Sequence, residues 1–265
     1  DEGYYCIDNL PASLLGVLVT QLQESDYAIT RGIAISIDAR NTSRDLALFP
    51  SMLEQARTQM DCDVIYLDAN KPTLIKRFSE TRRKHHLSDN ETDLVEAIET
   101  EKKRLEPIAN LASLTIDTSQ LNLYQLRDLV LERVARRAAT DLSLQFMSFG
   151  YKHGIPVDAD LVFDVRNLPN PYWKPELRAY TGRDQPVIDF LNQEAEVQNM
   201  FADIRDFLQK WLPSFKQNRR YLTVAIGCTG GQHRSVYLCE KLYAAFSTEY
   251  TLTNTRHREL HQVKQ

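Results

Sequence analysis

Tyr221-Leu222-Thr223-Val224-Ala225-Ile226-Gly227-Cys228-Thr229-Gly230-Gly231-Gln232-His233-Arg234-Ser235 is the stretch on which the fold of this 265-residue chain depends. Its first part is apolar and rich in β-branched residues, which predicts a buried strand. Two adjacent glycines then indicate a tight turn, and apolar residues recur at helical spacing over residues 236–246. We expect Ser235 to be the N-cap of that helix. The stretch therefore predicts a strand, an anion-binding loop and a helix.

The predicted loop carries residue types that suit phosphate. Gly230 and Gly231 have no Cβ atom, so backbone N–H groups can converge on an anion. Arg234 supplies a planar fork of donors for phosphate oxygens, and Thr229 and His233 can add side-chain contacts. We therefore expect these residues to bind a phosphate group.

Two other interpretations of the loop stay open. The spacing from Cys228 to Arg234 matches the phosphate loop of cysteine-dependent phosphatases, in which a thiolate attacks phosphorus. Those loops place a histidine directly before the cysteine, whereas this chain has Gly227 there. We favour binding over catalysis for that reason and name no catalytic residue. The remaining interpretation is a glycine-rich turn without any ligand.

The composition is that of an ordinary globular protein, with 26% charged and 43% hydrophobic residues in a length that suits two domains. The four cysteines form no Cys-x-x-Cys pair, so neither a zinc site nor a disulfide framework is indicated. No stretch resembles a signal peptide or a membrane span, and we expect a cytoplasmic protein without a membrane partner or metal. The net charge of −4 argues against a globally basic nucleic-acid binder but does not exclude local basic patches.

The first half of the chain alternates between helical and strand patterns. Helical spacing covers residues 11–24, 46–60, 72–81 and 92–105, and strand patterns cover 32–37, 64–68 and 113–119. This alternation predicts an α/β fold with a parallel sheet. A long amphipathic helix over 123–138 is expected to close a first domain at residue 139. A strand pattern at 142–149 then opens a second α/β domain, residues 140–265.

Acidic residues end two of the predicted strands of the first domain. Asp38 and Asp68 would lie at the carboxyl edge of a parallel sheet, where ligands bind, and could contact a metal or a nucleotide. Equally, such residues can simply begin turns or cap helices. A basic window over 76–86 resembles the phosphate-binding lid of a small-molecule kinase, or else is a solvated helix face.

Polar residues on constrained backbone mark the start of the second domain. Glycines flank Lys152 and His153, and a strand delivers Asp164 and Arg166 into a loop rich in proline and asparagine. These side chains are placed to meet a polar ligand, unless Asp164 and Arg166 pair with each other and His153 is structural. A single helical stretch is expected over 186–211.

The C-terminal tail, residues 253–265, contains several basic residues and little apolar content. This composition suits either a frayed terminus or a basic arm that contacts phosphate backbones.

Taken together, several motifs resemble the RapZ/YvcJ family over essentially the whole chain. They are Asp8-Asn9-Leu10-Pro11, Asp38-Ala39-Arg40-Asn41, Thr81-Arg82-Arg83, His153-Gly154-Ile155-Pro156, Phe163-Asp164-Val165-Arg166, Leu168-Pro169-Asn170-Pro171 and the loop from Gly227 to Ser235. The resemblance implies an N-terminal domain similar to P-loop kinases. It also implies a C-terminal domain that binds a sugar phosphate and RNA.

The resemblance further implies a role as an RNA-binding adapter. Such an adapter presents a small regulatory RNA to the endonuclease RNase E, and glucosamine-6-phosphate competes with the RNA. The family's sugar-phosphate pocket would correspond to His153, Asp164, Arg166, Thr181, Gly182, Thr229, Gly230, Gly231, His233 and Arg234. The tail residues Arg256, Arg258 and Lys264 would help to hold RNA. A homo-oligomer that needs no cofactor is expected.

The chain departs from the family's pattern in its nucleotide site. The motif Gly-x-x-x-x-Gly-Lys-Ser/Thr of a Walker A loop occurs nowhere in the sequence, and we expect that loop and the first strand to lie upstream of Asp1. Asp38, Ala39, Arg40 and Asn41 match the family's second nucleotide motif. ATP or GTP binding by this chain, and with it a third interpretation as a nucleotide-hydrolysing enzyme, therefore depends on a loop that the chain does not contain.

Overall fold

The computed structural model describes residues 3–24, 32–81, 84–88, 92–135 and 141–260, which form two compact units, residues 1–119 and 120–265. None of the described helices has the length and apolar character required to cross a membrane. Both units have α/β architecture with parallel strands, as the sequence predicts.

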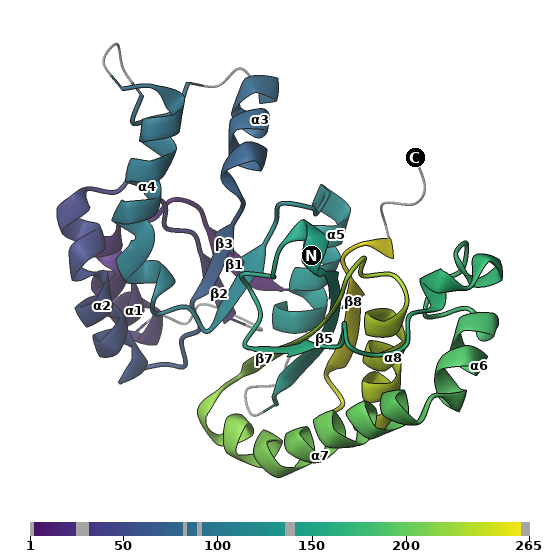
Figure 1. Cartoon of the computed structure of the whole chain (residues 1–265). Coiled ribbons are helices and arrows are strands. Elements are labelled where there is room, and N and C mark those ends of the chain that lie inside the picture. Colours follow the sequence, from purple (N-terminus) through teal and green to yellow (C-terminus); the bar gives the residue numbers. More distant parts are fainter. Residues whose placement is uncertain (1–2, 25–31, 82–83, 89–91, 136–140, 261–265) are drawn as a thin grey trace. The chain divides into compact units, whose positions relative to one another are not determined.

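The first unit contains two separate pairs of parallel strands (Figure 1). Strand β1 (Tyr4–Ile7) pairs with β2 (Gly32–Ile35), and β3 (Ile65–Asp68) pairs with β4 (Leu114–Asp117). Among the described residues no strand joins β2 to β3. The described strands of this unit therefore form two parallel pairs and not one continuous sheet.

Helices surround these strand pairs and bury a small core. They are η1 (Ala12–Leu14), α1 (Leu15–Glu24), α2 (Ser43–Arg57), α3 (Lys71–Thr81) and α4 (Leu94–Ala109). Side chains cap three of them, because Thr42 accepts a bond from the Asp45 N–H group, Asn70 accepts one from Thr73 and Asp93 accepts one from Glu96. Leu46, Phe49 and Leu53 of α2 pack against α1 and Ile108 of α4.

An apolar cavity of ≈ 450 Å³ lies in the first unit between β2 and the start of β3. Ile33 and Ile35 line it from one side and Val64 and Ile65 from the other, and α1 and α2 contribute Val19 and Phe49. Among the described residues of this unit, the cavity therefore lies between the two strand pairs.

The second unit is built on one four-stranded, fully parallel sheet. Its strands are β5 (Ser143–Gly150), β6 (Leu161–Asp164), β7 (Tyr221–Cys228) and β8 (Thr253–His257), in the order β6-β7-β5-β8. The central strands β5 and β7 are buried along their whole length. Such near-continuous burial is typical of a parallel sheet that is covered on both faces.

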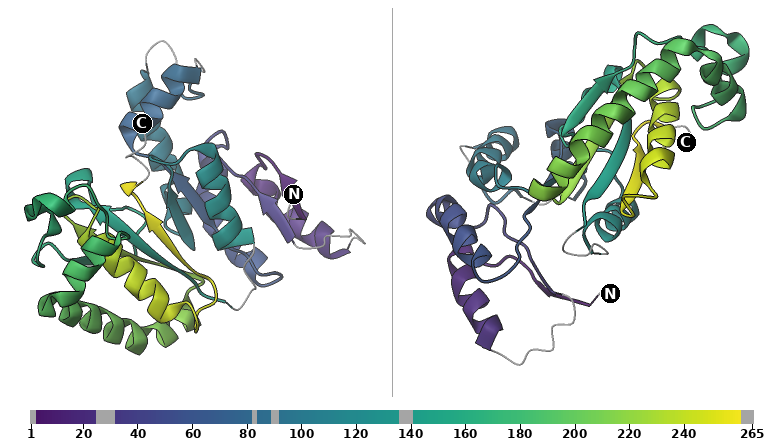
Figure 2. Two further views of the ribbon diagram at one scale, coloured as in Figure 1. Left: turned by 90° about the vertical axis from the view of Figure 1, so that its right-hand side faces the viewer. Right: turned by 90° about the horizontal axis from the view of Figure 1, so that it is seen from below.

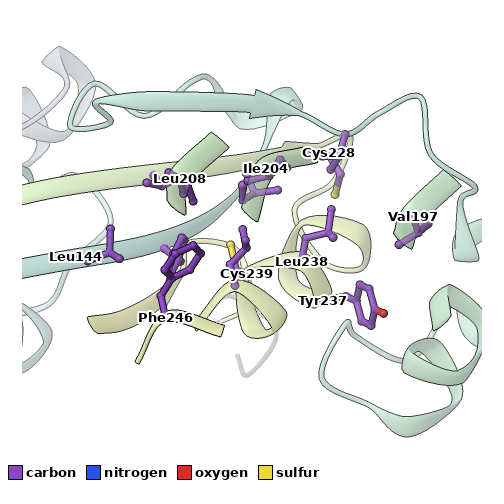
Figure 3. Close-up of a cluster of buried hydrophobic side chains, with 14 of the residues drawn as sticks. Leu144, Val197, Ile204, Leu208, Cys228, Tyr237, Leu238, Cys239 and Phe246 are labelled. Atoms are coloured by element: carbon purple, nitrogen blue, oxygen red, sulfur yellow. The ribbon is translucent and has the colours of Figure 1, made fainter. Parts of the chain in front are cut away.

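One face of this sheet is covered by α6 (Gln185–Gln193), α7 (Ala195–Asn218) and α8 (Arg234–Phe246). Helix α7 runs beside α8 (Figures 1 and 2). Figure 3 shows Leu208 of α7 and Phe246 of α8 in the apolar layer that includes Leu144 of β5. Burial of each such side chain stabilises the fold by ~1.5–3 kcal/mol.

The opposite face carries α5 (Leu123–Val130), which continues as a π-helical turn over Leu131–Ala135. The buried Arg133 of that turn donates to Thr223 Oγ1 (3.0 Å) and to Ser143 Oγ (3.3 Å). Burial lowers the pKa of Arg133 to about 10, although Asp158 and Asp160 oppose that shift. This helix therefore packs on the second sheet.

Two predictions about elements are wrong. The helical stretch expected over 186–211 is two helices, because Glu194 adopts an extended conformation between α6 and α7. The tail is neither frayed nor an arm over residues 253–257, since this segment is strand β8 and pairs with β5. The buried His257 joins it to the core, with Nδ1 2.7 Å from Ser148 Oγ and Nε2 2.8 Å from Glu240 Oε1.

Candidate functional site

The carboxyl ends of three neighbouring strands meet at one edge of the second sheet. Gly150 of β5 lies opposite Cys228 of β7, and Asp164 of β6 lies opposite Gly227. Strand β5 continues into a 3₁₀ turn, η3 (Tyr151–His153), whose Lys152 N–H group donates to the Thr229 carbonyl (3.3 Å). This edge is where ligands bind in open α/β sheets.

The loop between β7 and α8 has the predicted course from strand to turn to helix. Cys228 ends β7 and its sulfur accepts a hydrogen bond from the Gly231 N–H group (3.2 Å). Ser235 is not the N-cap, because α8 begins at Arg234 and His233 precedes it. Instead, the Ser235 hydroxyl lies in the first turn, 3.2 Å from Cys228 Sγ. The cysteine sulfur therefore organises the base of the loop.

Glycine is required at two positions for close backbone approach and leaves open space at a third. Gly231 has φ +73°, and a Cβ atom there would lie 2.4 Å from Glu259 Oε2. A Cβ atom on Gly150 would lie 2.7 Å from the carbonyl carbon of Gly230. By contrast, a Cβ atom on Gly230 would meet nothing within 4 Å. The face of the loop at Gly230 is thus open to a ligand.

Arg234 is buried beside this loop. Its Nη1 donates to the carbonyl oxygens of Arg166 (2.7 Å) and Leu168 (2.8 Å), and Nη2 donates to Thr229 Oγ1 (3.3 Å). Its Nε atom is buried and has no hydrogen-bond partner among the described residues. Burial lowers the pKa of Arg234, although the guanidinium of an arginine stays charged at neutral pH. A buried cation with an unused donor favours an anionic ligand.

His233 is also buried, and its Nε2 atom has no partner among the described residues. Burial lowers the pKa of His233, while hydrogen bonds to the carbonyls of Tyr180 and Leu177 oppose the shift. The ring is therefore neutral near pH 7, and because its one N–H group donates to these carbonyls, Nε2 is left as a hydrogen-bond acceptor.

Asp164 and Arg166 pair with each other, as one of the two sequence-based interpretations predicts. Arg166 Nε and Nη2 donate to the Asp164 carboxylate over 3.0 and 2.6 Å. These hydrogen bonds hold the pKa of Asp164 below its ordinary value. The Arg166 guanidinium also lies 3.9 Å from the centre of the Tyr151 ring. Both side chains are half exposed, so the pair remains accessible beside the loop.

The other residues assigned to the pocket by resemblance also lie around the loop. Gly182 donates its N–H to the Gln232 carbonyl (2.8 Å), and the Thr181 hydroxyl donates to Asp184, which precedes α6. His153 is exposed on η3; partial burial lowers its pKa, helped by the positive charges of Lys152 and Arg258. The structure therefore brings the predicted pocket residues of the second unit to one edge of the sheet.

Glu259 is a residue of this site that the sequence analysis did not identify. Its carboxylate is buried behind Gly231 and Gly150, and neither oxygen has a well-formed hydrogen bond from the described residues. Burial raises the pKa of Glu259, although the positive charge of Arg258, the nearby Gly150 N–H group and the charge of Lys152 oppose the shift. No local pattern could have indicated this position, since it depends on the pairing of β8 with β5.

The basic residues of the tail have different surroundings. Arg256 is largely buried and donates to Asp158 (3.2 Å), whereas Arg258 is half buried and donates to the Gly154 carbonyl (3.1 Å). Lys264 lies outside the described residues. The surroundings of Arg256 argue against a direct contact between its guanidinium and RNA.

In the first unit, residues 38–41 form a self-contained turn. Arg40 donates to both carboxylate oxygens of Asp38; burial alone would raise the pKa of Asp38, but these bonds lower it. Asn41 Oδ1 accepts from the Ala12 N–H group (2.7 Å), and the Ala39 carbonyl contacts His86 Nε2 (3.0 Å). The polar groups of these four residues therefore form hydrogen bonds with one another and with adjacent segments of the same unit.

Other candidate residues of this unit are also occupied by protein contacts. Asp68 accepts from Lys102 (2.8 Å), which favours the structural interpretation of this strand end. A metal ion could fit between three side chains of this unit, His85, His86 and Glu101, which lie close together. However, His85 already uses both ring nitrogens, because Nδ1 accepts a hydrogen bond from the Leu87 N–H group and Nε2 lies 2.6 Å from Glu101. A proton on Nε2 satisfies both contacts and leaves no lone pair for a metal. Arg82 and Arg83 of the predicted lid lie outside the described residues.

Comparisons with known proteins match both parts of the chain. Residues 1–138 match the family model described as the RapZ-like N-terminal domain, and residues 142–261 match the RapZ C-terminal domain. A nucleotide-binding protein of Hahella chejuensis is 53% identical over 264 residues, which cover 99% of this chain and 92% of that protein.

Two further relatives are similar over the same extent. A nucleotide-binding protein of Saccharophagus degradans is 52% identical over 264 residues, covering 99% of this chain and 91% of the relative. A nucleotide-binding protein of Cellvibrio japonicus is 53% identical over 265 residues, covering 99% and 89%. The similarity thus extends through both units.

Proposed function

We propose that this chain, which belongs to the RapZ family, is an RNA-binding adapter whose β7–α8 loop senses a sugar phosphate. In this proposal the ligand is glucosamine-6-phosphate, and the RNA is a small regulatory RNA that the protein presents to RNase E in the cytoplasm. Amino-sugar synthesis would thereby be regulated without any reaction catalysed by the chain itself.

The observation that carries this proposal is the buried Arg234 beside a loop with one open face. Its Nε donor is unused among the described residues, and the space above Gly230 is empty of protein atoms. A phosphate group there would accept hydrogen bonds from a cation that is already desolvated, which makes each bond stronger than in water. The exposed Asp164–Arg166 pair and the exposed His153 would contact the sugar hydroxyls and amine in this proposal.

Competition between the sugar phosphate and RNA requires only charge. If an RNA phosphate contacts the same edge, an occupied loop repels it, and the two ligands exclude each other. A homo-oligomer would repeat the edge several times and raise the avidity for a structured RNA. No cofactor is needed for this mechanism.

The test is RNA binding across a salt series, with and without glucosamine-6-phosphate. We expect a steep fall of affinity with salt and displacement of RNA by the sugar phosphate. Arg234→Ala is expected to weaken the binding of glucosamine-6-phosphate roughly 10- to 100-fold, the usual effect of losing hydrogen bonds to a charged group. Arg205→Ala on α7 removes the same charge elsewhere and is the matched control. Unchanged sugar-phosphate affinity in a folded Arg234→Ala protein would remove the loop from the proposal.

Nucleotide binding is part of the names of the relatives, and we propose that this chain alone binds ATP or GTP weakly. The sequence has no Walker A motif, and the side chains of Asp38 and Arg40 hold each other. A titration with either nucleotide that gives affinity in the micromolar range would contradict this proposal.

A second candidate function is a cysteine-dependent phosphatase. It is favoured by the contacts of Cys228 Sγ, which accepts a hydrogen bond from the Gly231 N–H group and lies beside Ser235 Oγ, because such donors would stabilise a thiolate nucleophile. In that reaction the thiolate attacks phosphorus, the bond to the leaving alkoxide breaks, and the alkoxide takes a proton. Water then cleaves the phosphocysteine, which releases inorganic phosphate and restores the thiolate.

The residue before Cys228, which is Gly227, distinguishes the adapter function from the phosphatase function. A Cβ atom at this position would lie 2.4 Å from the Phe149 ring, so the histidine typical of such phosphatases does not fit before Cys228. Hydrolysis of para-nitrophenyl phosphate that is lost in Cys228→Ser would favour the phosphatase. Hydrolysis that survives this substitution would exclude a cysteine nucleophile.

A further inference from the structure

Residues 168–182 form a segment, here called the aromatic arch, that is fixed to the anion-binding loop at both ends. At its start, Arg234 Nη1 donates to the Leu168 carbonyl (2.8 Å). At its end, the Gly182 N–H group donates to the Gln232 carbonyl (2.8 Å), and a Cβ atom on Gly182 would lie 2.3 Å from the His233 carbonyl oxygen. The position of the arch therefore depends directly on the position of the loop.

The arch presents two large aromatic side chains to solvent. Trp173 is 74% exposed and Tyr172 is 51% exposed, and their rings meet edge to face at 6.1 Å between centroids. Both lie on the short turn η4 (Pro171–Trp173), whose neighbour η5 (Pro175–Leu177) buries Leu177 in the core. Large apolar side chains that gather on a surface indicate an interaction site more often than isolated ones do.

The backbone beneath these rings is held firmly. Asn170 Oδ1 accepts from the Tyr172 N–H group (3.3 Å), and the Trp173 N–H group donates to the Asn170 carbonyl (3.2 Å). Arg178 Nε donates to the Tyr172 carbonyl (2.9 Å), and its guanidinium lies 5.1 Å from the Tyr172 ring centre. The rings are thus displayed on a rigid support together with a positive charge.

We propose that Tyr172 and Trp173 form a stacking platform for an unpaired nucleobase of a single RNA strand whose phosphate lies at the Arg234 loop. This inference rests on the proposed RNA binding and names the structural class of RNA. Flat rings next to cations are the chemistry by which proteins hold single strands, because every base has a face that can stack.

The spacing of the two parts suits a short strand. Trp173 follows Leu168 by five residues, which limits their separation to at most ~18 Å even for an extended chain. About five stacked nucleotides span that distance at ~3.4 Å each. Glucosamine-6-phosphate has no nucleobase that could stack on the rings, so the two ligands share the loop but not the platform.

The chain contains only two tryptophans, Trp173 and Trp211, and this allows a direct test. Trp211 lies on α7 and is 45% exposed, so it serves as a matched control. In a Trp211→Phe protein all tryptophan fluorescence comes from Trp173, and in a Trp173→Phe protein it comes from Trp211. We expect a single-stranded oligoadenylate of about ten nucleotides to quench Trp173 but to leave Trp211 unchanged.

Affinity supplies the second readout. Trp173→Ala is expected to weaken the binding of the oligoadenylate about 5- to 100-fold, the usual range for loss of one stacked base. Trp173→Phe keeps an aromatic ring and is expected to retain most of the affinity. The slope of log K against log salt should stay unchanged, because no charge is removed. A decrease in that slope would indicate an altered phosphate contact and not a lost stack.

The outcomes separate this inference from the function on which it rests. RNA binding with a normal salt slope, but without quenching of Trp173 or loss of affinity in Trp173→Ala, would exclude the platform and leave RNA binding intact. Equal quenching by a fully paired RNA duplex, or by glucosamine-6-phosphate alone, would also overturn it, since neither offers an unpaired base. Absence of RNA binding by every variant at low salt would reject the adapter function, and the platform with it.

Discussion

At the residue scale, the buried carboxylate of Glu259 lies in surroundings that disfavour its charge. It lies against Gly231 behind the anion-binding loop, and neither of its oxygens has a well-formed hydrogen bond from the described residues. A buried ionised group without such partners destabilises the folded state. Burial accordingly raises the pKa of Glu259. A phosphate bound in the loop would favour the protonated form of Glu259 further, because like charges repel.

The substitution Glu259→Gln is therefore expected to stabilise the protein at neutral pH. A carboxyl whose pKa is raised in the folded state contributes most stability below its ordinary pKa, and that contribution is lost as pH rises through the raised value. Glutamine keeps the shape without the charge, so the free energy of unfolding at pH 7 should increase by about 1–3 kcal/mol. Near pH 4 the variant and the wild type should be similar.

Urea unfolding at several pH values measures this effect, and the exposed Glu176→Gln is the matched control. If Glu259→Gln is no more stable than the wild type at pH 7, the carboxylate charge is compensated in the folded protein and the argument from burial is wrong.

Residue type alone predicted which loop residues would gather, but not the contacts they make. Gly230, Gly231 and Arg234 are adjacent in the sequence, so a strand-turn-helix pattern is enough to place them together. By contrast, Arg234 meets the Leu168 carbonyl, and Glu259 lies behind Gly231, through contacts between distant segments. Such contacts depend on strand order, which local patterns do not specify.

At the element scale, the two glycines of the loop should respond differently to substitution by alanine. Gly231→Ala should lower the free energy of unfolding by roughly 1–3 kcal/mol, because alanine disfavours φ +73° and its Cβ would approach Glu259 Oε2. Gly230→Ala should change stability by no more than about 0.5 kcal/mol, since its Cβ meets nothing within 4 Å. However, the added methyl group would occupy the open face of the loop and weaken the binding of phosphate there.

Thermal unfolding together with calorimetric titration of glucosamine-6-phosphate distinguishes the two variants. Full sugar-phosphate affinity in Gly230→Ala would mean that the anion does not lie over Gly230. A Gly231→Ala protein with the stability of the wild type would mean that the loop can relax around Glu259.

Apolar elements could be predicted from the sequence, whereas a polar strand could not. Strands β5 and β7 are apolar runs bounded by turns, and both were expected at nearly their observed positions. Strand β8 has the sequence Thr-Asn-Thr-Arg-His, which local propensity assigns to a terminus. It is a strand because β5 offers a free edge and because His257 joins Ser148 and Glu240 inside the protein.

At the scale of the whole molecule, the assignment of α5 to one part of the chain depends on the criterion used for the boundary. The sequence predicts a division at residue 139, the family models divide between 138 and 142, and the compact units divide between 119 and 120. The helix follows the second unit because the buried Arg133 donates to Ser143 and Thr223. An arginine in an amphipathic pattern gives no sign that it will be buried.

The two units differ in how well each core is filled. The second unit has a continuous sheet with two strands buried along their length. The first has two separate strand pairs and an apolar cavity of ≈ 450 Å³ beside β2 and β3. Missing atoms in a core remove dispersion contacts without any compensating gain. The first unit should therefore be the less stable of the two.

We expect two unfolding transitions in calorimetry, with the first unit unfolding at the lower temperature. Leu46→Ala in α2 and Leu208→Ala in α7 each remove a buried side chain from one core, at a cost of about 2–5 kcal/mol. Leu46→Ala should lower only the first transition and Leu208→Ala only the second, because each unit has its own apolar cluster. Hydrogen exchange assigns the transitions, since β1–β4 should exchange before β5 and β7. A single transition that both substitutions lower equally would show that the units unfold as one cooperative structure.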